Sequence, residues 1–276
     1  MSVSKMKTVI ILILVLMNLF LLMLVVPNFM PRYHQAQQAQ TQLQTLFESY
    51  QLSLDLSTLP KSQPITSVNV SYDSDAALTA AKALLGDTVL VEEDPALYYS
   101  SYTSSSGTLR VYRSGLCDAA LTGFDAVSDP AEHAQKLLTR MGLDICAITA
   151  QDTGTGAVAV TATQSIGGIP LDPAQIQLVY TDGCLTQLSG TLYLGTLSRP
   201  SSQTCLDCGE ALIAFLGSRD ALGWVADQVY AVEQCYTHAG TASAATVRLD
   251  PSWKITTDTG YYLVNGITGA VTTGTA

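Results

Sequence analysis

The feature that most constrains this chain is an uncharged apolar run near its N-terminus. Residues 8–26 read TVIILILVLMNLFLLMLVV, nineteen positions without a charged side chain, preceded by Lys5 and Lys7 and followed by Pro27. As a helix the run rises about 28 Å at about 1.5 Å per residue, close to the roughly 30 Å of a bilayer's hydrocarbon core. It therefore predicts a transmembrane helix. The alternative is a cleavable secretory signal, but its apolar part usually has only about 7 to 15 residues and ends at a small-residue site, whereas VVPNFMPRY stands here.

The basic residues beside the run predict its orientation, because cationic flanks stay on the cytoplasmic side. Lys5 and Lys7 lie in a seven-residue tail that has no acid. We therefore expect a single-pass protein of the cell membrane, with a cytoplasmic N-terminus, an extracytoplasmic C-terminal part and lipid around helix 8–26. Asn18 stands alone among apolar residues, and it is a candidate for hydrogen bonding to a neighbouring membrane helix.

The part beyond the run is strongly acidic. Two of the 13 Lys and Arg precede the run, so 11 remain against 23 Asp and Glu, a net charge of −12. Because this charge repels phosphate, we expect no nucleic-acid partner. The hydrophobic content of 47% favours a folded domain over a disordered one.

After the run, apolar residues recur at spacings of three and four, the pattern of a helix with one apolar seam. The seam consists of Tyr33, Ala36, Gln40, Leu43, Phe47, Tyr50 and Leu54. Two interpretations are open. The first is a juxtamembrane stalk helix over residues 32–57 that pairs weakly with a second copy, and the second is a helix that lies on its own domain.

Beyond residue 57 the chain alternates single helices with groups of strands. Helices are predicted from caps, apolar stripes and terminal glycines, with Asp75 as the first cap, Asp129 as the second, and Cys205 and Cys208 on the buried face of the third. Strands are predicted at 68–70, 89–91, 97–102, 109–112, 158–164, 176–180, 225–236, 244–249, 253–256 and 261–264.

A helix followed by several antiparallel strands, stated three times, predicts an α+β fold. We expect an N-terminal transmembrane helix and then repeated modules, each with one helix packed on an antiparallel β-sheet. The predicted boundaries are 1–31 for the tail and anchor, 32–57 for the stalk, and 58–126, 127–198 and 199–276 for the three modules.

The sequence lacks the usual catalytic motifs. There is no G-x-S-x-G, no H-E-x-x-H, no phosphate loop and no kinase catalytic loop, and His34, His133 and His238 are expected at the surface. Residues 92–94 (EED) are expected to be a solvated turn rather than a cation site. DTGTGAV at 152–158 is expected to be a hairpin turn, because it lacks the third glycine of a dinucleotide loop and precedes a strand. We therefore predict a protein that is not an enzyme and holds no cofactor or metal.

The six cysteines are scattered, which favours buried thiols over a disulfide framework, with one or more disulfides as the alternative. Cys205 and Cys208 form a C-x-x-C at a predicted helix start, where the helix dipole lowers the pKa of a thiol. They are a candidate redox or disulfide pair. Simple packing in the buried stripe is the alternative, and the second C-x-x-C that a zinc site of four cysteines would need is absent.

Several segments resemble a known family. LDPSWKITTDTGYYLVNGITGAV at 249–271 resembles the closing hairpin of PepSY-type modules, and QSIGGIPLDPAQIQLVYTDGCLTQLSG at 164–190 is similar to the strand-turn-strand core of the same modules. Together with the basic tail, the single membrane helix and LSLDLSTLP at 52–60, nearly the whole chain resembles the YycI and YycH type of accessory proteins. The motif residues are Trp253, Tyr261, Tyr262, Asn265 and Gly269, which suit the core of a hairpin or a partner surface.

The resemblance implies a membrane-anchored ectodomain with two PepSY-like modules at 127–198 and 199–276. Such a protein associates with the extracytoplasmic part and membrane helices of a sensor histidine kinase of a cell-wall-related two-component system. It modulates the signalling of that kinase without catalysing a reaction, and a paralogous accessory protein is a further implied partner. Related modules also occur in protease propeptides, so the alternative is an inhibitor or chaperone of an exported peptidase. The scattered cysteines do not belong to the family pattern.

Overall fold

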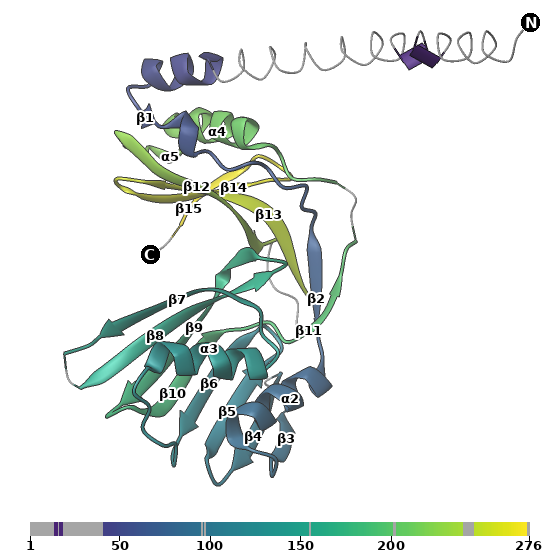
Figure 1. Ribbon diagram of the computed structural model, residues 1–276, viewed down its shortest axis with the longest axis vertical. Coiled ribbons are helices and arrows are strands. Elements are labelled where there is room, and N and C mark those ends of the chain that lie inside the picture. Colours follow the sequence, from purple (N-terminus) through teal and green to yellow (C-terminus); the bar gives the residue numbers. More distant parts are fainter. Residues whose placement is uncertain are drawn as a thin grey trace, which may run out of the picture.

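The protein is an α+β structure with a large, mostly antiparallel sheet and few helices (Figure 1). This computed structural model describes residues 14–15, 17–18, 41–94, 96, 98–154, 156–200, 203–239 and 246–274. Its strands form one continuous network that divides into two parts, which we name the large sheet (β3 to β10) and the small sheet (β1, β2 and β11 to β15). The two parts are joined where β9 and β12 run parallel, at Leu171 and Tyr236.

The large sheet is antiparallel throughout and has the order β3-β4-β5-β6-β10-β9-β8-β7. Helices α2 and α3 cover one of its faces (Figure 1). The strands are β3 Leu90–Asp94, β4 Tyr99–Ser104, β5 Gly107–Tyr112, β6 Leu116–Leu121, β7 Ile145–Asp152, β8 Ala157–Ile166, β9 Ile169–Thr181 and β10 Cys184–Thr191, and the helices are α2 Ser74–Leu85 and α3 Pro130–Arg140.

Capping side chains fix where these two helices begin. Asp129 accepts a hydrogen bond from the N–H of Glu132 at 3.0 Å, so the predicted start of α3 is confirmed. The predicted cap of α2 is wrong by two residues. Asp73 is the N-cap, with a carboxylate oxygen 2.9 Å from the N–H of Asp75, because Asp73 still has extended backbone angles whereas Asp75 lies in the first turn.

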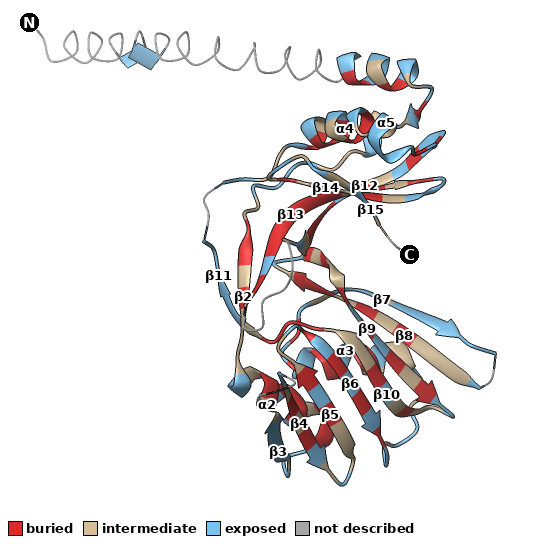
Figure 2. Cartoon of the chain, turned by 180° about the vertical axis from the view of Figure 1, so that it is seen from behind, coloured by how far each residue is buried: buried red, intermediate tan, exposed pale blue. Residues whose placement is uncertain are grey.

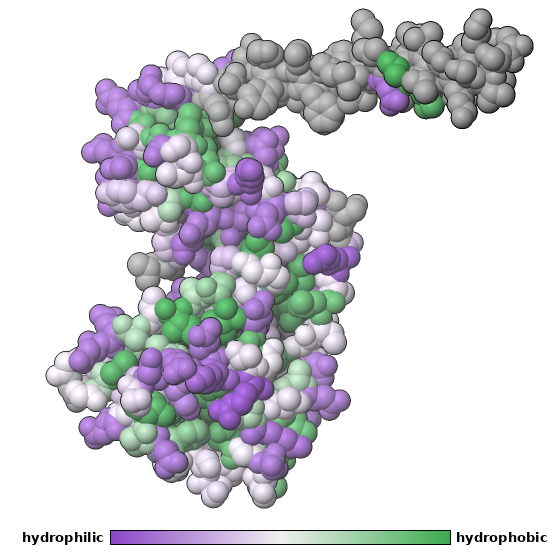
Figure 3. Space-filling model, viewed as in Figure 1, coloured by the Kyte–Doolittle hydropathy of each residue, from purple (hydrophilic) through white to green (hydrophobic). Residues whose placement is uncertain are grey.

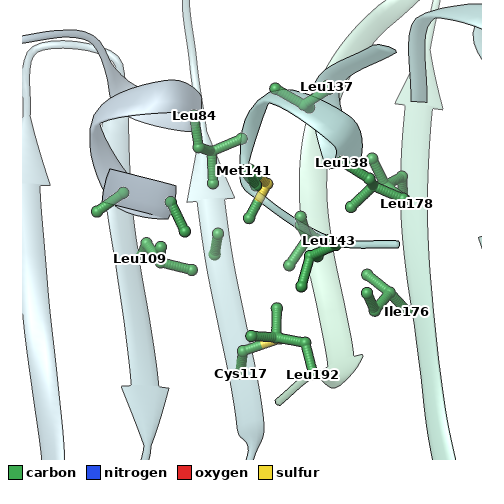
Figure 4. Close-up of a cluster of buried hydrophobic side chains, with 14 of the residues drawn as sticks. Leu84, Leu109, Cys117, Leu137, Leu138, Met141, Leu143, Ile176, Leu178 and Leu192 are labelled. Carbon is green, nitrogen blue, oxygen red and sulfur yellow. The ribbon is translucent and has the colours of Figure 1, made fainter. Parts of the chain in front are cut away.

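The helices and the large sheet enclose one apolar core. Figure 4 shows Leu84 of α2, Leu137 and Leu138 of α3, and Met141, which follows α3, in one cluster with apolar side chains of the sheet. All four are at least 97% buried. The buried stripe predicted for this helix, which consists of Ala134, Leu137, Leu138 and Met141, is therefore confirmed, and both helices are held mainly by apolar burial.

The small sheet has the order β11-β2-β13-β12, with β14 and β15 continuing from the second half of β13. Helices α4 and α5 lie on the face turned away from the large sheet (Figure 1). The elements are β1 Ser53–Leu54, η1 Leu56–Thr58, β2 Val68–Tyr72, β11 Gly195–Ser198, α4 Cys208–Gly217, α5 Arg219–Leu222, β12 Gln228–His238, β13 Thr246–Thr257, β14 Gly260–Asn265 and β15 Val271–Thr273.

The two strands predicted at 244–249 and 253–256 are one strand, β13, which continues through Pro251. Its first half pairs with β2 up to Leu249, and its second half pairs with β14 from Ser252 onward. Pro251 lies between the residues that pair with β2 and those that pair with β14, so the N–H that proline lacks is not needed for a hydrogen bond to either strand. The division into two strands was wrong for this reason.

The third helix begins later than predicted. Asp207 and Glu210 form a reciprocal capping box, with distances of 2.8 and 2.9 Å, so α4 starts at Cys208. Cys205 lies before the helix in an extended segment, where its N–H donates to the carbonyl of Ile65 at 2.9 Å. The placement of Cys205 on the helix is therefore wrong.

The helical segment 41–49, which we name the docked helix, lies on the small-sheet half. Leu43 and Phe47 are 8% and 2% exposed and pack with α4 and with Trp224, which follows α5, in one core cluster that also includes Tyr50 and Leu54. Figure 2 shows the buried side of this segment turned toward α4. The interpretation of a helix lying on its own domain is confirmed for 41–49. The helix predicted to continue to residue 57 is wrong beyond that point, because the chain turns after residue 49 and Leu54 belongs to strand β1, where it still packs in the same cluster. Residues 32–40 of the predicted stalk lie outside the described residues.

Strand pairing departs from the predicted module boundaries. Strands β6 and β10 are hydrogen-bonded across the boundary at 126/127, and β2, assigned to the first module, pairs with β13 of the third. These boundaries do not separate independent sheets, because strand pairing depends on contacts between residues far apart in sequence.

The predicted anchor lies mostly outside the described residues. Of residues 1–31, only 14–15 and 17–18 are described, and all four are helical. In the part of the chain that the structure describes, no helix has both the length and the apolar character needed to cross a bilayer.

Candidate functional site

A groove lies between the two sheets, and we name it the inter-sheet groove. It consists of two cavities of about 300 and 350 Å³ that share Asp172 as a lining residue. The outline of the molecule is indented between its two halves (Figure 3). The lining side chains that carry charge, a thiol or an imidazole are Cys146, Asp172, Glu233, Cys235, His238 and Lys254.

An ion pair crosses the groove at its centre. The Lys254 ammonium of β13 lies 2.8 Å from a carboxylate oxygen of Asp172 in β9, and their side chains are 26% and 13% exposed. Burial alone lowers the pKa of Lys254, but the hydrogen bond and negative charge of Asp172 outweigh it and raise that pKa above its usual value. The ring of Tyr261 lies 4.1 Å from the ammonium and adds a cation–π contact. The pair links the small sheet to the large one.

A second link across the halves is a hydrogen bond between Tyr193, which follows β10, and His238 at the end of β12. Burial lowers the pKa of His238, so its imidazole is neutral at pH 7. His238 is exposed, as predicted for a surface histidine, whereas His133 differs from that prediction. It is half-buried, with Nδ1 2.9 Å from the Tyr180 hydroxyl, because α3 packs this side against the large sheet.

The thiols of the groove are not activated. Cys235 is 1% exposed, and burial raises its pKa far above the ordinary thiol value. Cys146 is exposed, yet partial burial of its sulfur also raises its pKa. Since the thiolate is the reactive form, neither residue is a good nucleophile at neutral pH.

The predicted pair Cys205 and Cys208 is present as free thiols. Burial raises the pKa of each to about 11, which outweighs the helix dipole at Cys208. The Cys205 sulfur packs against Gly266, where an added Cβ would collide with it. The arrangement suits packing and is unfavourable for thiol exchange.

The family-motif residues of the C-terminal hairpin are built into its fold. Trp253 is fully buried and donates its indole N–H to the Leu206 carbonyl at 2.9 Å. Tyr262 is 7% exposed and packs on Phe215 and Trp224. These contacts place both side chains in the core of the small-sheet half.

Asn265 and Gly269 form the turn after β14. The Asn265 side chain accepts from the N–H groups of Ile267 and Thr268, each at 2.9 Å. Gly269 has φ = +71° and donates to the Asn265 carbonyl at 2.8 Å. Of the five motif residues, Tyr261 is the one in contact with the ion pair of the inter-sheet groove.

The remaining candidates from the sequence are placed as follows. Asn18 donates its side-chain amide to the carbonyl of Leu14 at 2.9 Å. Residues 92–94 belong to strand β3, rather than to the predicted turn, because they pair with β4. Residues 152–158 connect β7 to β8, as predicted for a hairpin. Among the described residues, no three His, Cys, Asp or Glu side chains are grouped so that they would hold a metal ion.

Asp172, Glu233 and Lys254 were not singled out from the sequence. Lys254 carried a signal, since it is the single basic residue of segment 249–271. Asp172 lies between Pro170 and Pro173, a position that suggested a turn rather than a strand. Only the pairing of β9 with β12 brings the two charges together.

The groove therefore offers charged and hydrogen-bonding groups for recognition, with protonated thiols and a neutral imidazole. A scan against protein-family models finds no match, and a search of the curated proteins finds none. Among solved structures, the chain is similar to an uncharacterized protein from Eubacterium rectale, with a TM-score of 0.47 and 11% sequence identity. The alignment covers 76% of this chain and 86% of that chain.

Proposed function

We propose that this chain is a membrane-anchored regulatory protein that binds a sensor histidine kinase of a cell-wall-related two-component system and alters its signalling without catalysing a reaction. The observation that carries the proposal is the uncharged run of nineteen residues at 8–26, which precedes a folded, acidic domain. The basic tail at Lys5 and Lys7 supports a cytoplasmic N-terminus and an extracytoplasmic domain.

The succession of elements supports the PepSY-like part of the proposal. Each of three helices is followed by four strands that neighbour one another in order: α2 by β3 to β6, α3 by β7 to β10, and α4 by β12 to β15 with the short α5 between. We infer that these are three copies of one module, of which the first two are joined edge to edge through β6 and β10.

The connection between anchor and domain supports a role in signalling across a membrane. Beyond the docked helix, the Ser53 N–H donates to the Asp227 carbonyl at 2.9 Å, and β1 pairs with β12. An Arg219 guanidinium nitrogen lies 3.0 Å from the Tyr50 carbonyl, between the rings of Tyr50 and Trp224. These contacts fasten the docked helix to the small-sheet half, which is what an accessory protein needs in order to favour one state of its partner.

The test is crosslinking in living cells followed by mass spectrometry, with kinase output measured in a deletion strain. We expect a sensor kinase among the crosslinked proteins and a changed output of its response regulator after deletion. A matched control replaces residues 1–31 with a cleavable secretory signal, so that the domain is exported without an anchor. We expect this variant to lose the crosslink. If no kinase is recovered and every kinase output is unchanged by deletion, the proposal is wrong.

A further inference from the structure

Strand β7 is an open edge of the large sheet. Among the described strands it pairs with β8 alone, and six of its eight residues are exposed. An edge strand presents unpaired N–H and C=O groups and is a template for another strand unless charge, proline or a cover protects it. Residues 145–151 read ICAITAQ and contain no charge and no proline.

The hydrogen-bond pattern identifies which backbone groups point outward. The Thr153 N–H donates to the Ala157 carbonyl at 3.0 Å, and bonded pairs alternate along an antiparallel ladder. With the observed register, Gln151 and Thr149 bond to β8, whereas Ile148 and Ala150 direct their N–H and C=O groups away from it. These outward groups are the ones that a further strand would use.

The edge also leaves the apolar core partly open. Ile145 and Ile148 pack against the core of the large-sheet half but remain partly exposed. Their side chains share the helix-covered face, where an added strand would place every second side chain. Apolar residues at alternate positions of an added strand would therefore complete the core at this end.

The opposite edge of the same sheet is protected. Strand β3 carries Glu92, Glu93 and Asp94 within five residues. The Arg113 N–H donates to the Tyr98 carbonyl, so every second residue of β4 from Tyr98 onward bonds to β5, and the residues between them bond to β3. With the observed register of β3 and β4, the N–H and C=O groups of Val91 therefore point outward. This edge provides a matched control for β7.

Carboxylates stand at both ends of the β7 edge. Asp144 precedes the strand and Asp152 ends it, and Glu233 lines the same cavity as Cys146 at its start. All three are exposed, and none forms an ion pair with another described residue. A segment that fits this edge has an uncharged centre and basic ends.

We propose that the β7 edge, with the adjoining inter-sheet groove, binds an extended segment of the partner by strand addition. The segment has apolar residues at alternate positions and a Lys or Arg at each end. Main-chain hydrogen bonds to Ile148 and Ala150 provide affinity, and the side chains beside Ile145 and Ile148 provide selectivity. The inference rests on the proposed function, since it names the surface and the kind of segment through which the kinase is bound.

The test uses the full-length protein in cell membranes, with a photo-crosslinking amino acid at position 151 or, separately, at position 18. We compare Ala150→Pro, which removes an outward N–H while the bonds to β8 remain, with Val91→Pro on the β3 edge. The kinase crosslink from position 151 should fall about tenfold in Ala150→Pro and stay unchanged in Val91→Pro. Thr149→Lys, whose side chain lies on the uncovered face, should lower it as well, because it places a charge opposite the uncharged centre of the bound segment.

The outcomes separate the two proposals. A kinase crosslink from position 18 together with none from position 151 would sink the strand-addition inference and leave the proposed function standing. Capture of only a second copy of this chain from position 151 would also overturn the inference. The absence of a kinase from both positions would count against the proposed function itself. The thermal midpoints of the three variants, measured on the same samples, should lie within about 2 °C of the parent because no bond of the ladder is lost.

Discussion

The two halves of the molecule differ in how the apolar face of each sheet is covered. In the large-sheet half, α2 and α3 lie side by side over strands that all come from residues 90–191. In the small-sheet half, α4 covers the sheet together with the docked helix, and α5 lies beside α4. The sheet itself includes β1, β2 and β11. The first half is assembled from consecutive residues, and the second collects segments from both sides of it in sequence.

The difference follows from what one helix can cover. A single helix covers only a narrow stripe, whereas a sheet of several strands has a wide apolar face that needs more than one helix to cover it. The strands β3 to β6 and β7 to β10 are joined edge to edge, so α2 and α3 both cover one sheet. The strands β12 to β15 have α4 and no such neighbour, so Leu43, Phe47 and Leu52 complete their cover. The segment that leads from the proposed anchor is thereby part of the core.

The largest expected effect tests whether the docked helix contributes to the core of the small-sheet half. Phe47→Ala should lower the free energy of unfolding of the small-sheet half by about 3 to 5 kcal/mol, because it removes a fully buried aromatic ring. Trp224 and Trp253, the two tryptophans of the chain, both lie in that half, so their fluorescence during denaturation reports on it.

Leu138→Ala is the matched variant in the large-sheet half. It should cost about 2 to 5 kcal/mol there and should shift the circular dichroism transition more than the tryptophan transition. If Phe47→Ala costs less than about 1 kcal/mol, the docked helix is not part of the core of the small-sheet half.

The next effect concerns two glutamines, each of which forms two hydrogen bonds from its side-chain amide to the N–H and C=O of one residue, as a neighbouring strand would. Gln164 accepts from the Tyr193 N–H at 2.9 Å and donates to its carbonyl at 3.0 Å, and Gln234 does the same for Gln63 at 2.8 and 3.1 Å. Gln164→Ala should cost about 2 to 3 kcal/mol because Tyr193 is buried. Gln234→Ala should cost about 1 kcal/mol, since the backbone of exposed Gln63 regains water. Equal losses in urea denaturation would contradict this account.

The sequence predicted local elements well and their assembly poorly, for a physical reason. Helix α3 was found because Asp129, Pro130 and Glu132 act within one turn, and the β8–β9–β10 run because its alternation and turn are local. The pairing of β2 with β13 and of β6 with β10 depends on contacts between residues that are far apart in sequence. The Lys254–Asp172 ion pair depends on the same long-range pairing, so no local pattern revealed the groove.

A smaller effect is expected from the ion pair that joins the halves. Lys254→Met leaves Asp172 without its partner and should lower stability by about 1 to 2 kcal/mol, less than for a fully buried pair because water reaches both groups. The folded-state pKa of Lys254 is raised, so this contribution is fully present below the unfolded pKa of about 10.4 and is lost as pH rises through the folded value.

A double-mutant cycle with Asp172→Asn isolates the coupling between the two side chains. Its coupling energy should decrease with added salt. Arg110→Met, which breaks a looser surface pair of 3.9 Å with Asp118, should change stability much less. A cycle that shows no coupling would mean that the halves are held by the pairing of β9 with β12 and by the Tyr193–His238 hydrogen bond rather than by this ion pair.

The smallest effect concerns the two histidine–tyrosine pairs, one within the large-sheet half and one between the halves. Burial lowers the pKa of both His133 and His238 in the folded state, so folding favours their neutral forms. Their contribution is present above the unfolded pKa of about 6.5 and is lost as pH falls through the folded values. The thermal midpoint should therefore decrease on acidification below about pH 6.5, and His238→Gln should reduce this dependence.

His133→Gln should act in the same direction but should leave the junction between the halves unaffected, because Tyr180 belongs to the same half as α3. If the pH dependence is identical in the parent and both variants, the acid sensitivity arises from carboxylates rather than from these imidazoles.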